Sequence, residues 1–139
     1  MHGFILFLHF FGLMLGAAGG FASAFIMRRA SAAPADQAQV LRGLGWPLAM
    51  MSATGLLILW ITGIMMLVGA GGPGVMPMLF WWKIAFVVVA TVLVGLTHGT
   101  YAEMRRTGNM ALGQRLKVIG PATGISVLLA VLFASYAFA

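Results

Sequence analysis

Four long apolar stretches, separated by short polar or glycine-rich segments, dominate the pattern of this chain. They cover approximately residues 4–27, 44–68, 79–101 and 118–138. Each is close to the ~20 residues that an α-helix needs to cross the hydrocarbon core of a bilayer. The pattern therefore predicts an all-α integral membrane protein, with residues 1–139 forming a single membrane domain, a four-helix bundle.

Composition agrees with a membrane protein and excludes several kinds of chemistry. The 139 residues are 62% hydrophobic and 7% charged, whereas a soluble domain carries about 25% charged residues. No cysteine is present, which excludes disulfides, thiolate metal sites and cysteine nucleophiles. The first apolar stretch is followed, not preceded, by Arg28-Arg29, so we expect a retained span and not a signal peptide.

Basic residues are distributed unevenly over the connections. Of the eight Lys and Arg residues, seven lie in the first and third connections, namely Arg28, Arg29, Arg42, Arg105, Arg106, Arg115 and Lys117. Only Lys83 lies at the other side. By the positive-inside rule, the first and third connections are cytoplasmic and both termini are periplasmic. The net charge of +6 thus indicates a multi-pass protein of a bacterial inner membrane, not a nucleic-acid partner.

The first span carries a histidine and a row of glycines on one predicted helix face. Residues three and four apart are neighbours on a helix, which places His9, Gly12, Gly16, Gly20 and Ser23 together. Small residues at this spacing allow membrane helices to approach closely. We therefore expect His9 to lie at the end of a groove in which another helix packs.

Two histidines, His9 and His98, lie within predicted spans, where ionisable residues are rare and usually functional. Four interpretations remain open for each: a haem ligand, a ligand of another metal, a proton relay, or a hydrogen bond to a neighbouring helix. Both carboxylates, Asp36 and Glu103, belong to connections. This leaves no serine–histidine–acid set or carboxylate pair and argues against hydrolytic catalysis.

Depth in the membrane separates the two histidines. His9 lies 19 residues before Arg28, and His98 lies 7 residues before Arg105. At ~1.5 Å per residue, their depths differ by about 18 Å, which is too much for the two axial ligands of one haem. Lys83 lies 22 residues before Arg105, at nearly the depth of His9.

Counting residues from the arginines also indicates which side chains lie at the level of His9. Met65, Met66 and Trp82 fall near the level of His9, and His/Met is a known axial pair of haem b. We predict an outer haem pocket around His9, with an inner pocket around His98 as the second choice. Lys83 is either an interfacial anchor beside the tryptophans or a cation that receives a haem propionate or an anionic substrate group.

Other features allow different functions. Met76 and Met78, close to the histidine level, form a weak candidate for a copper site. Gly120 and Gly124 in the last span are compatible with a homo-oligomer.

The pattern resembles a group of four-helix bacterial membrane proteins. The group includes the haem-dependent membrane protoporphyrinogen oxidases and the copper-resistance-protein-D-like domains. The features that carry the resemblance are Leu8-His9 with the glycines after it, the glycine-flanked stretch 55–63, and Trp82-Lys83 with His98 further on. The resemblance implies a haem-linked function at His9 and an essential lysine at Lys83.

These observations together predict a haem b-binding redox protein of the inner membrane. It would oxidise a tetrapyrrole or pass electrons to a quinone, with Lys83 orienting an anionic group. The alternatives are a copper-uptake protein and a structural or assembly subunit of a larger membrane complex. The expected partners are the lipid bilayer and a membrane-soluble small molecule such as a tetrapyrrole or quinone.

Overall fold

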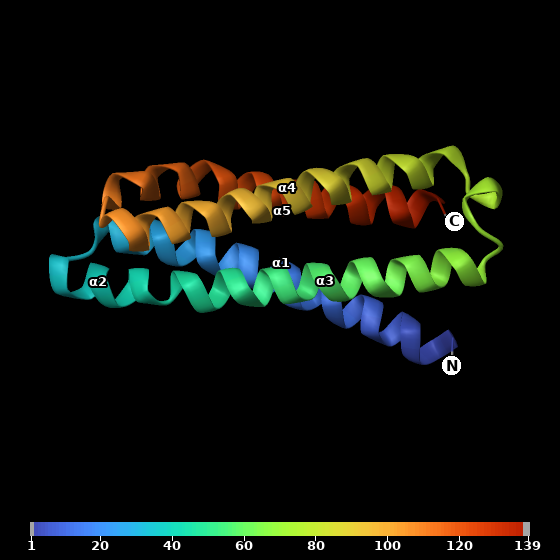
Figure 1. The fold of residues 1–139 in the computed structure, drawn as a ribbon, viewed down its shortest axis with the longest axis horizontal. Coiled ribbons are helices and arrows are strands. Elements are labelled where there is room, and N and C mark those ends of the chain that lie inside the picture. Colours follow the sequence, from blue (N-terminus) through green and yellow to red (C-terminus); the bar gives the residue numbers. More distant parts are fainter. Residues whose placement is uncertain (1, 138–139) are drawn as a thin grey trace.

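The chain forms a bundle of long helices joined by short connections, as a computed structural model of residues 2–137 shows (Figure 1). Four of its helices are long and apolar enough to cross a membrane, in agreement with the sequence prediction. The elements are α1 (His2–Ala32), α2 (Ala35–Gly43), α3 (Gly45–Gly69), η1 (Pro73–Val75), α4 (Met78–Thr107), η2 (Met110–Leu112) and α5 (Gly113–Ala137). The predicted spans lie within α1, α3, α4 and α5, with two exceptions: the second begins at Leu44, one residue before α3, and the predicted end at 138 falls outside the described residues.

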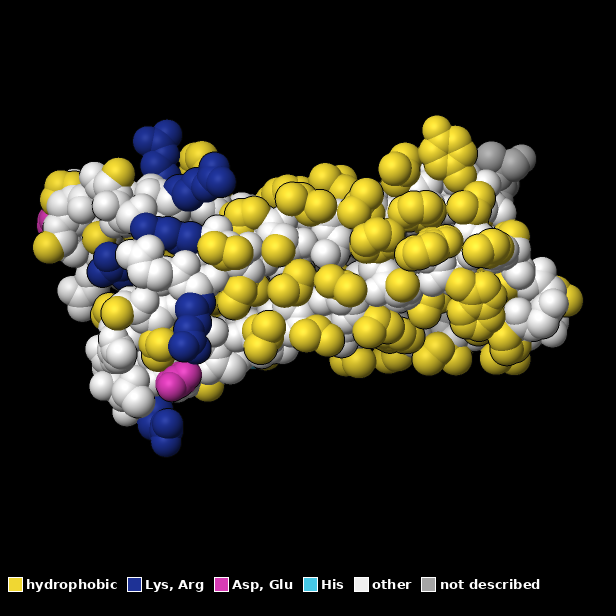
Figure 2. Space-filling model, turned by 90° about the horizontal axis from the view of Figure 1, so that it is seen from above, with side chains coloured by type: hydrophobic (Ala, Val, Ile, Leu, Met, Phe, Trp, Pro, Cys, Tyr) yellow, Lys and Arg dark blue, Asp and Glu magenta, His cyan; other side chains and the backbone are white. Residues whose placement is uncertain are grey.

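The two ends of the bundle differ in charge. The chain ends and the η1 connection lie at one end, which we call the terminal end, and α2 and η2 lie at the other, which we call the basic end (Figure 1). The basic end carries Arg29, Arg42, Arg105 and Arg106 in last helical turns. Figure 2 shows Lys and Arg side chains gathered there, while hydrophobic side chains cover the rest of the visible face.

Such an apolar surface is compatible with contact to lipid. Large side chains such as Phe4, Phe7 and Leu57 are exposed along the helices, where a water-soluble protein would place polar groups.

Helix α1 packs closely on α3, and α4 packs closely on α5. Glycine makes the first pairing possible: a Cβ at Gly12 would lie 2.9 Å from the Gly55 carbonyl oxygen, and one at Gly19 would lie 2.7 Å from that of Leu48. A Cβ at Gly20 meets only the Ser52 hydroxyl, at 3.9 Å. The predicted glycine face is therefore the contact face, although Gly20 contributes less to it than Gly12 and Gly19 do.

The glycines of the last span pack inside the bundle. A Cβ at Gly120 would lie 3.4 Å from the Ala24 side chain, and one at Gly124 would lie 3.1 Å from the Phe21 ring. Both neighbours belong to α1. These two glycines therefore do not form an exposed face for a homo-oligomer, because α1 covers them, and oligomerisation itself stays a prediction.

The tightest packing lies in the basic half. There a cluster of buried side chains joins all four long helices: Met27, Ala49, Tyr101, Met104 and Leu116. In the terminal half, Figure 1 shows the first part of α1 diverging from α4 and α5. The four long helices thus share a buried cluster in the basic half, while α1 separates from α4 and α5 in the terminal half.

Candidate functional site

A cavity of about 700 Å³ lies in the terminal half of the bundle, and α1, α3, α4 and α5 all contribute to its wall. Its volume falls in the ~300–1,000 Å³ range typical of cofactor and small-molecule sites. Most of the wall is apolar, with Leu6, Phe10, Leu59 and Val87 among its residues. The polar or ionisable side chains that line it are those of His2, His9, Trp60, Trp81, Lys83 and Ser135.

His9 is held in this wall by a hydrogen bond to the neighbouring helix. Its Nδ1 lies 2.8 Å from Oγ1 of Thr62 in α3. The Thr62 hydroxyl in turn donates to the backbone carbonyl of Ile58, at 2.6 Å. Thr62 is 3% exposed, so this pairing is enclosed by protein, and the orientation of the imidazole ring is fixed by α3.

Lys83 enters the same cavity from the second turn of α4. Its Nζ lies 5.4 Å from the centroid of the Phe80 ring, which is within the distance at which an aromatic face attracts a cation. The side chain is half-buried and not fully extended into solvent. The structure thus brings His9 and Lys83 together, as the count of depth along the spans predicts.

The predicted methionine and tryptophan partners divide into inward and outward residues. Met66 lines the cavity, whereas Met65 is 49% exposed and is not among the described lining residues. Trp82 is 51% exposed and stacks on Phe133 with 6.4 Å between ring centroids. Its neighbour Trp81 lines the cavity instead. Of the three, Met66 therefore faces the cavity and Met65 and Trp82 do not, and the cofactor-binding role of each stays a prediction.

His98 lies far from this cavity, in the basic half. Its Nδ1 is 3.0 Å from the carbonyl oxygen of Val94, and its ring packs edge-on against Trp46 at 5.5 Å. Trp46 and Thr62 are 16 residues apart on α3, or about 24 Å along the helix. His9 and His98 therefore cannot ligate one haem, in agreement with the depth argument.

The surroundings of His98 also disfavour an inner haem pocket. Its Nε2 has no exposed surface and no hydrogen-bond partner among the described residues. Trp46, which covers the ring, is itself in contact with Tyr101 and with the guanidinium of Arg105. This packing leaves no open coordination position at His98.

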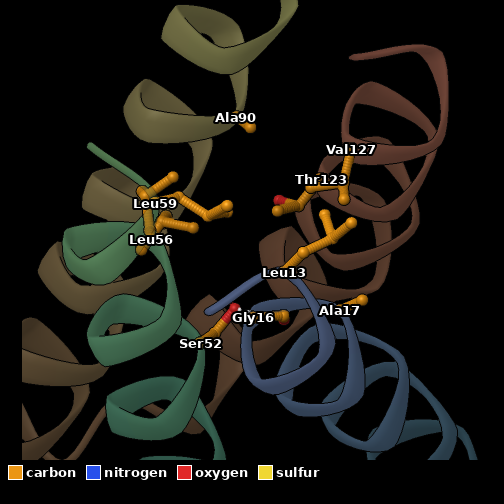
Figure 3. A pocket seen from close by; sticks show the side chains of 10 residues that line it. Leu13, Gly16, Ala17, Ser52, Leu56, Leu59, Ala90, Thr123 and Val127 are labelled. Carbon is orange, nitrogen blue, oxygen red and sulfur yellow. Dashed lines mark hydrogen bonds between the residues drawn. The ribbon is translucent and has the colours of Figure 1, made fainter. Parts of the chain in front are cut away.

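A second, much smaller cavity lies at the centre of the bundle. It has a volume of about 20 Å³ and shares Leu13, Leu59 and Ala90 with the wall of the large cavity. Figure 3 shows Ser52 and Thr123 contributing its hydroxyl groups from opposite sides. A site of this size holds about one water molecule, so of these two cavities only the large one has room for a cofactor.

Sequence reasoning did not assign a role to two of these residues. His2 stands near the start of the chain and lines the cavity. Thr62 is one of several hydroxyl residues in the second apolar stretch. The signal that would have found it is depth, because Thr62 lies 20 residues after Arg42 and His9 lies 19 residues before Arg28.

Within residues 2–137, no three His, Cys, Asp or Glu side chains come together as a metal site. The fold and cavity define a multi-pass helical membrane protein with a histidine and a lysine facing a shared internal site. No protein-family model, curated protein or solved structure matches the chain.

Proposed function

We propose that this chain is a redox protein of the bacterial inner membrane that binds haem b in the large cavity. The basic end faces the cytoplasm, by the positive-inside rule, and both termini face the periplasm. The haem site then lies in the outer half of the membrane. Three features of the molecule support this proposal: the cavity, its donor groups and the apolar surface of the bundle.

The observation that carries the proposal is that His9 and Lys83 face one apolar cavity of about 700 Å³. Haem b needs an apolar slot for its ring, a nitrogen or sulfur ligand for its iron, and a cation for its propionates. His9 supplies the nitrogen and Lys83 supplies the cation. Met66 and Met76 also line the cavity, and either thioether would complete a His/Met pair.

When bound, haem supplies one-electron transfer. The chain's own residues fix the ring of His9, neutralise an anionic group at Lys83, and exclude water through the apolar walls. A membrane-soluble tetrapyrrole or quinone fits this setting as redox partner, because both reach the site from lipid. In the tetrapyrrole version, Lys83 orients a carboxylate of the substrate.

The proposal is tested by the haem content of protein purified in mild detergent. We expect the wild type to carry haem and His9→Ala to lose it. His98→Ala is the matched control, because Trp46, which packs on His98, lies about 24 Å along α3 from Thr62, the partner of His9; we expect this variant to keep its haem. A colourless wild type that also fails to bind added haem, or equal haem in His9→Ala, contradicts the proposal.

Copper transport is the second candidate, and one observation favours it. His2, His9, Met66 and Met76 all line the cavity, and such nitrogen and thioether donors select Cu(I). If the cavity passes copper, the double substitution Met66→Leu with Met76→Leu should abolish Cu(I) binding by the purified protein. Met65→Leu is the control, because Met65 lies outside the cavity wall. Unchanged Cu(I) binding in the double variant contradicts this alternative.

A further inference from the structure

The hydrogen bonds around His9 determine which of its ring nitrogens carries a proton. A threonine hydroxyl has a single hydrogen, and Thr62 gives it to the Ile58 carbonyl at 2.6 Å. The Thr62 oxygen therefore accepts from His9, and the donor at 2.8 Å is His9 Nδ1–H. A backbone carbonyl has no hydrogen to give, so this direction cannot reverse while the Ile58 bond is kept.

It follows that Nε2 of a neutral His9 carries a lone pair. A neutral imidazole has one N–H, and here that hydrogen is used toward Thr62. The ring itself lines the cavity, and Gly63 leaves space beside it, because a Cβ there would lie 3.6 Å from His9 Cε1. The cavity is thus offered an electron-pair donor, not a hydrogen-bond donor.

We propose that Thr62 is a positioning residue that holds His9 in its Nδ1–H form, and that the cavity thereby selects a metalloporphyrin over the metal-free ring. This inference rests on the proposed haem site. A metal-free tetrapyrrole has the same shape and the same carboxylates, so it satisfies the apolar wall and Lys83 equally well. Its two inner N–H groups lie in the plane of the ring and point away from a nitrogen above it, whereas a metal in the ring accepts the Nε2 lone pair directly.

In metal-binding proteins, a hydrogen bond from the other ring nitrogen orients the ligating histidine in the same way. A ligating imidazole almost always donates its other N–H to a fixed acceptor, and removal of the acceptor costs roughly 10- to 100-fold in metal affinity. In many sites the acceptor is a carboxylate. Here a hydroxyl backed by a helix carbonyl takes that place, which suits a membrane interior because no charge is buried.

The tautomer is tested by ¹⁵N NMR of the ligand-free protein labelled at histidine. The signals of His9 are assigned by their loss in His9→Gln. We expect a protonated Nδ1 and an unprotonated Nε2 in the wild type and in Thr62→Ser, and exchange between tautomers in Thr62→Val. Protonation at Nε2 in the wild type, or an unchanged spectrum in Thr62→Val, overturns the role of Thr62.

Selectivity is tested by titration with two fluorescent rings, Zn(II) protoporphyrin and metal-free protoporphyrin. Zinc takes one axial ligand here, so the result does not depend on a methionine. We expect the wild type and Thr62→Ser to bind the zinc ring at least tenfold more tightly. Thr62→Val should lower the affinity for the zinc ring by roughly tenfold or more and leave the affinity for the metal-free ring unchanged.

Thr100→Val is the matched control for loss of a buried threonine hydroxyl. Thr100 is 7% exposed and bonds its own helix at the Leu96 carbonyl, so we expect wild-type binding of both rings. Equal affinity of the wild type for the two rings overturns the selectivity. If neither ring binds, both the selectivity and the proposed haem function fail, while the NMR spectrum still decides the role of Thr62.

Discussion

Lys83 illustrates how a single side chain limits what the cavity accepts. Its ammonium belongs to a wall that is otherwise largely apolar, and a charge removed from water is costly unless an opposite charge or hydrogen-bond acceptor is present. The contact with the Phe80 ring at 5.4 Å compensates only part of this cost. An anionic group on the ligand would supply the rest.

We therefore expect Lys83→Gln to weaken haem binding by roughly tenfold or more, because the variant loses one hydrogen bond between charged groups. Haem dimethyl ester, which lacks the free carboxylates, should bind the wild type and Lys83→Gln equally well. Absorbance titrations of the purified protein measure both affinities. An equal loss for haem and its ester would show that Lys83 acts on the fold and not on a propionate.

At the scale of residues, depth was predictable from the sequence but rotation about the helix axis was not. Counting residues from the arginines placed Lys83 at the level of His9, and the structure has both in one cavity. Adjacent residues on a helix point about 100° apart, so Met65 and Met66 project in different directions, and of the two only Met66 lines the cavity. The packing of α3 on α1 decides between them, and that packing is not visible in the apolar pattern.

Thr62 was missed for a related reason. Serine and threonine in helices commonly bond the carbonyl four residues earlier in their own helix, and Thr54, Thr91 and Thr123 all do so here. Thr62 does the same toward Ile58. Only the three-dimensional contact with His9 distinguishes it from the other threonines.

At the scale of elements, the crossing of α1 and α3 sets the position of His9. Gly55 lies at the closest approach, where a Cβ would lie 2.6 Å from the Gly12 carbonyl oxygen and would also overlap the backbone nitrogen of Gly16. A Cβ at Gly16 itself would lie 3.7 Å from its nearest neighbour, the Ser52 carbonyl oxygen. Gly16 therefore has room for the methyl group of an alanine, and Gly55 does not.

We expect Gly55→Ala to lower the stability of the bundle by about 1–3 kcal/mol, because overpacking displaces helix backbones that cannot yield. Gly16→Ala should leave stability near that of the wild type, since its contact is an ordinary van der Waals distance. Thermal unfolding in detergent, followed by circular dichroism, compares the two variants. Equal destabilisation by both would mean that the helices do not cross at Gly55.

At the scale of the whole molecule, charge separates the two ends of the bundle, and the proposed orientation follows from it. The chain has no cysteine, so one introduced residue reports its own side of the membrane. We expect an impermeant maleimide to label Gly74→Cys in intact cells. Gln39→Cys, in α2 at the basic end, should react only after the membrane is opened. The reverse pattern would place the cavity in the inner half of the membrane.

The architecture itself was predictable because each apolar stretch is long enough to span a bilayer and its connections are short. The four long helices and the pairing through glycines both followed from that pattern. The cavity could not be predicted from the apolar pattern, because it lies where the first part of α1 diverges from α4 and α5 (Figure 1). Divergence depends on the crossing of helix pairs, and local apolar spacing carries no information about that angle.

Chemical rescue at position 9 tests the haem site most directly. His9→Gly removes the imidazole and leaves a space of its shape, which free imidazole can fill as a ligand. We expect His9→Gly to lose the Soret band of protein-bound haem, and added haem with imidazole to restore it in the fraction that elutes with the protein. A Soret band that persists in His9→Gly without imidazole, or no band under any condition in the wild type, would contradict ligation of haem by His9.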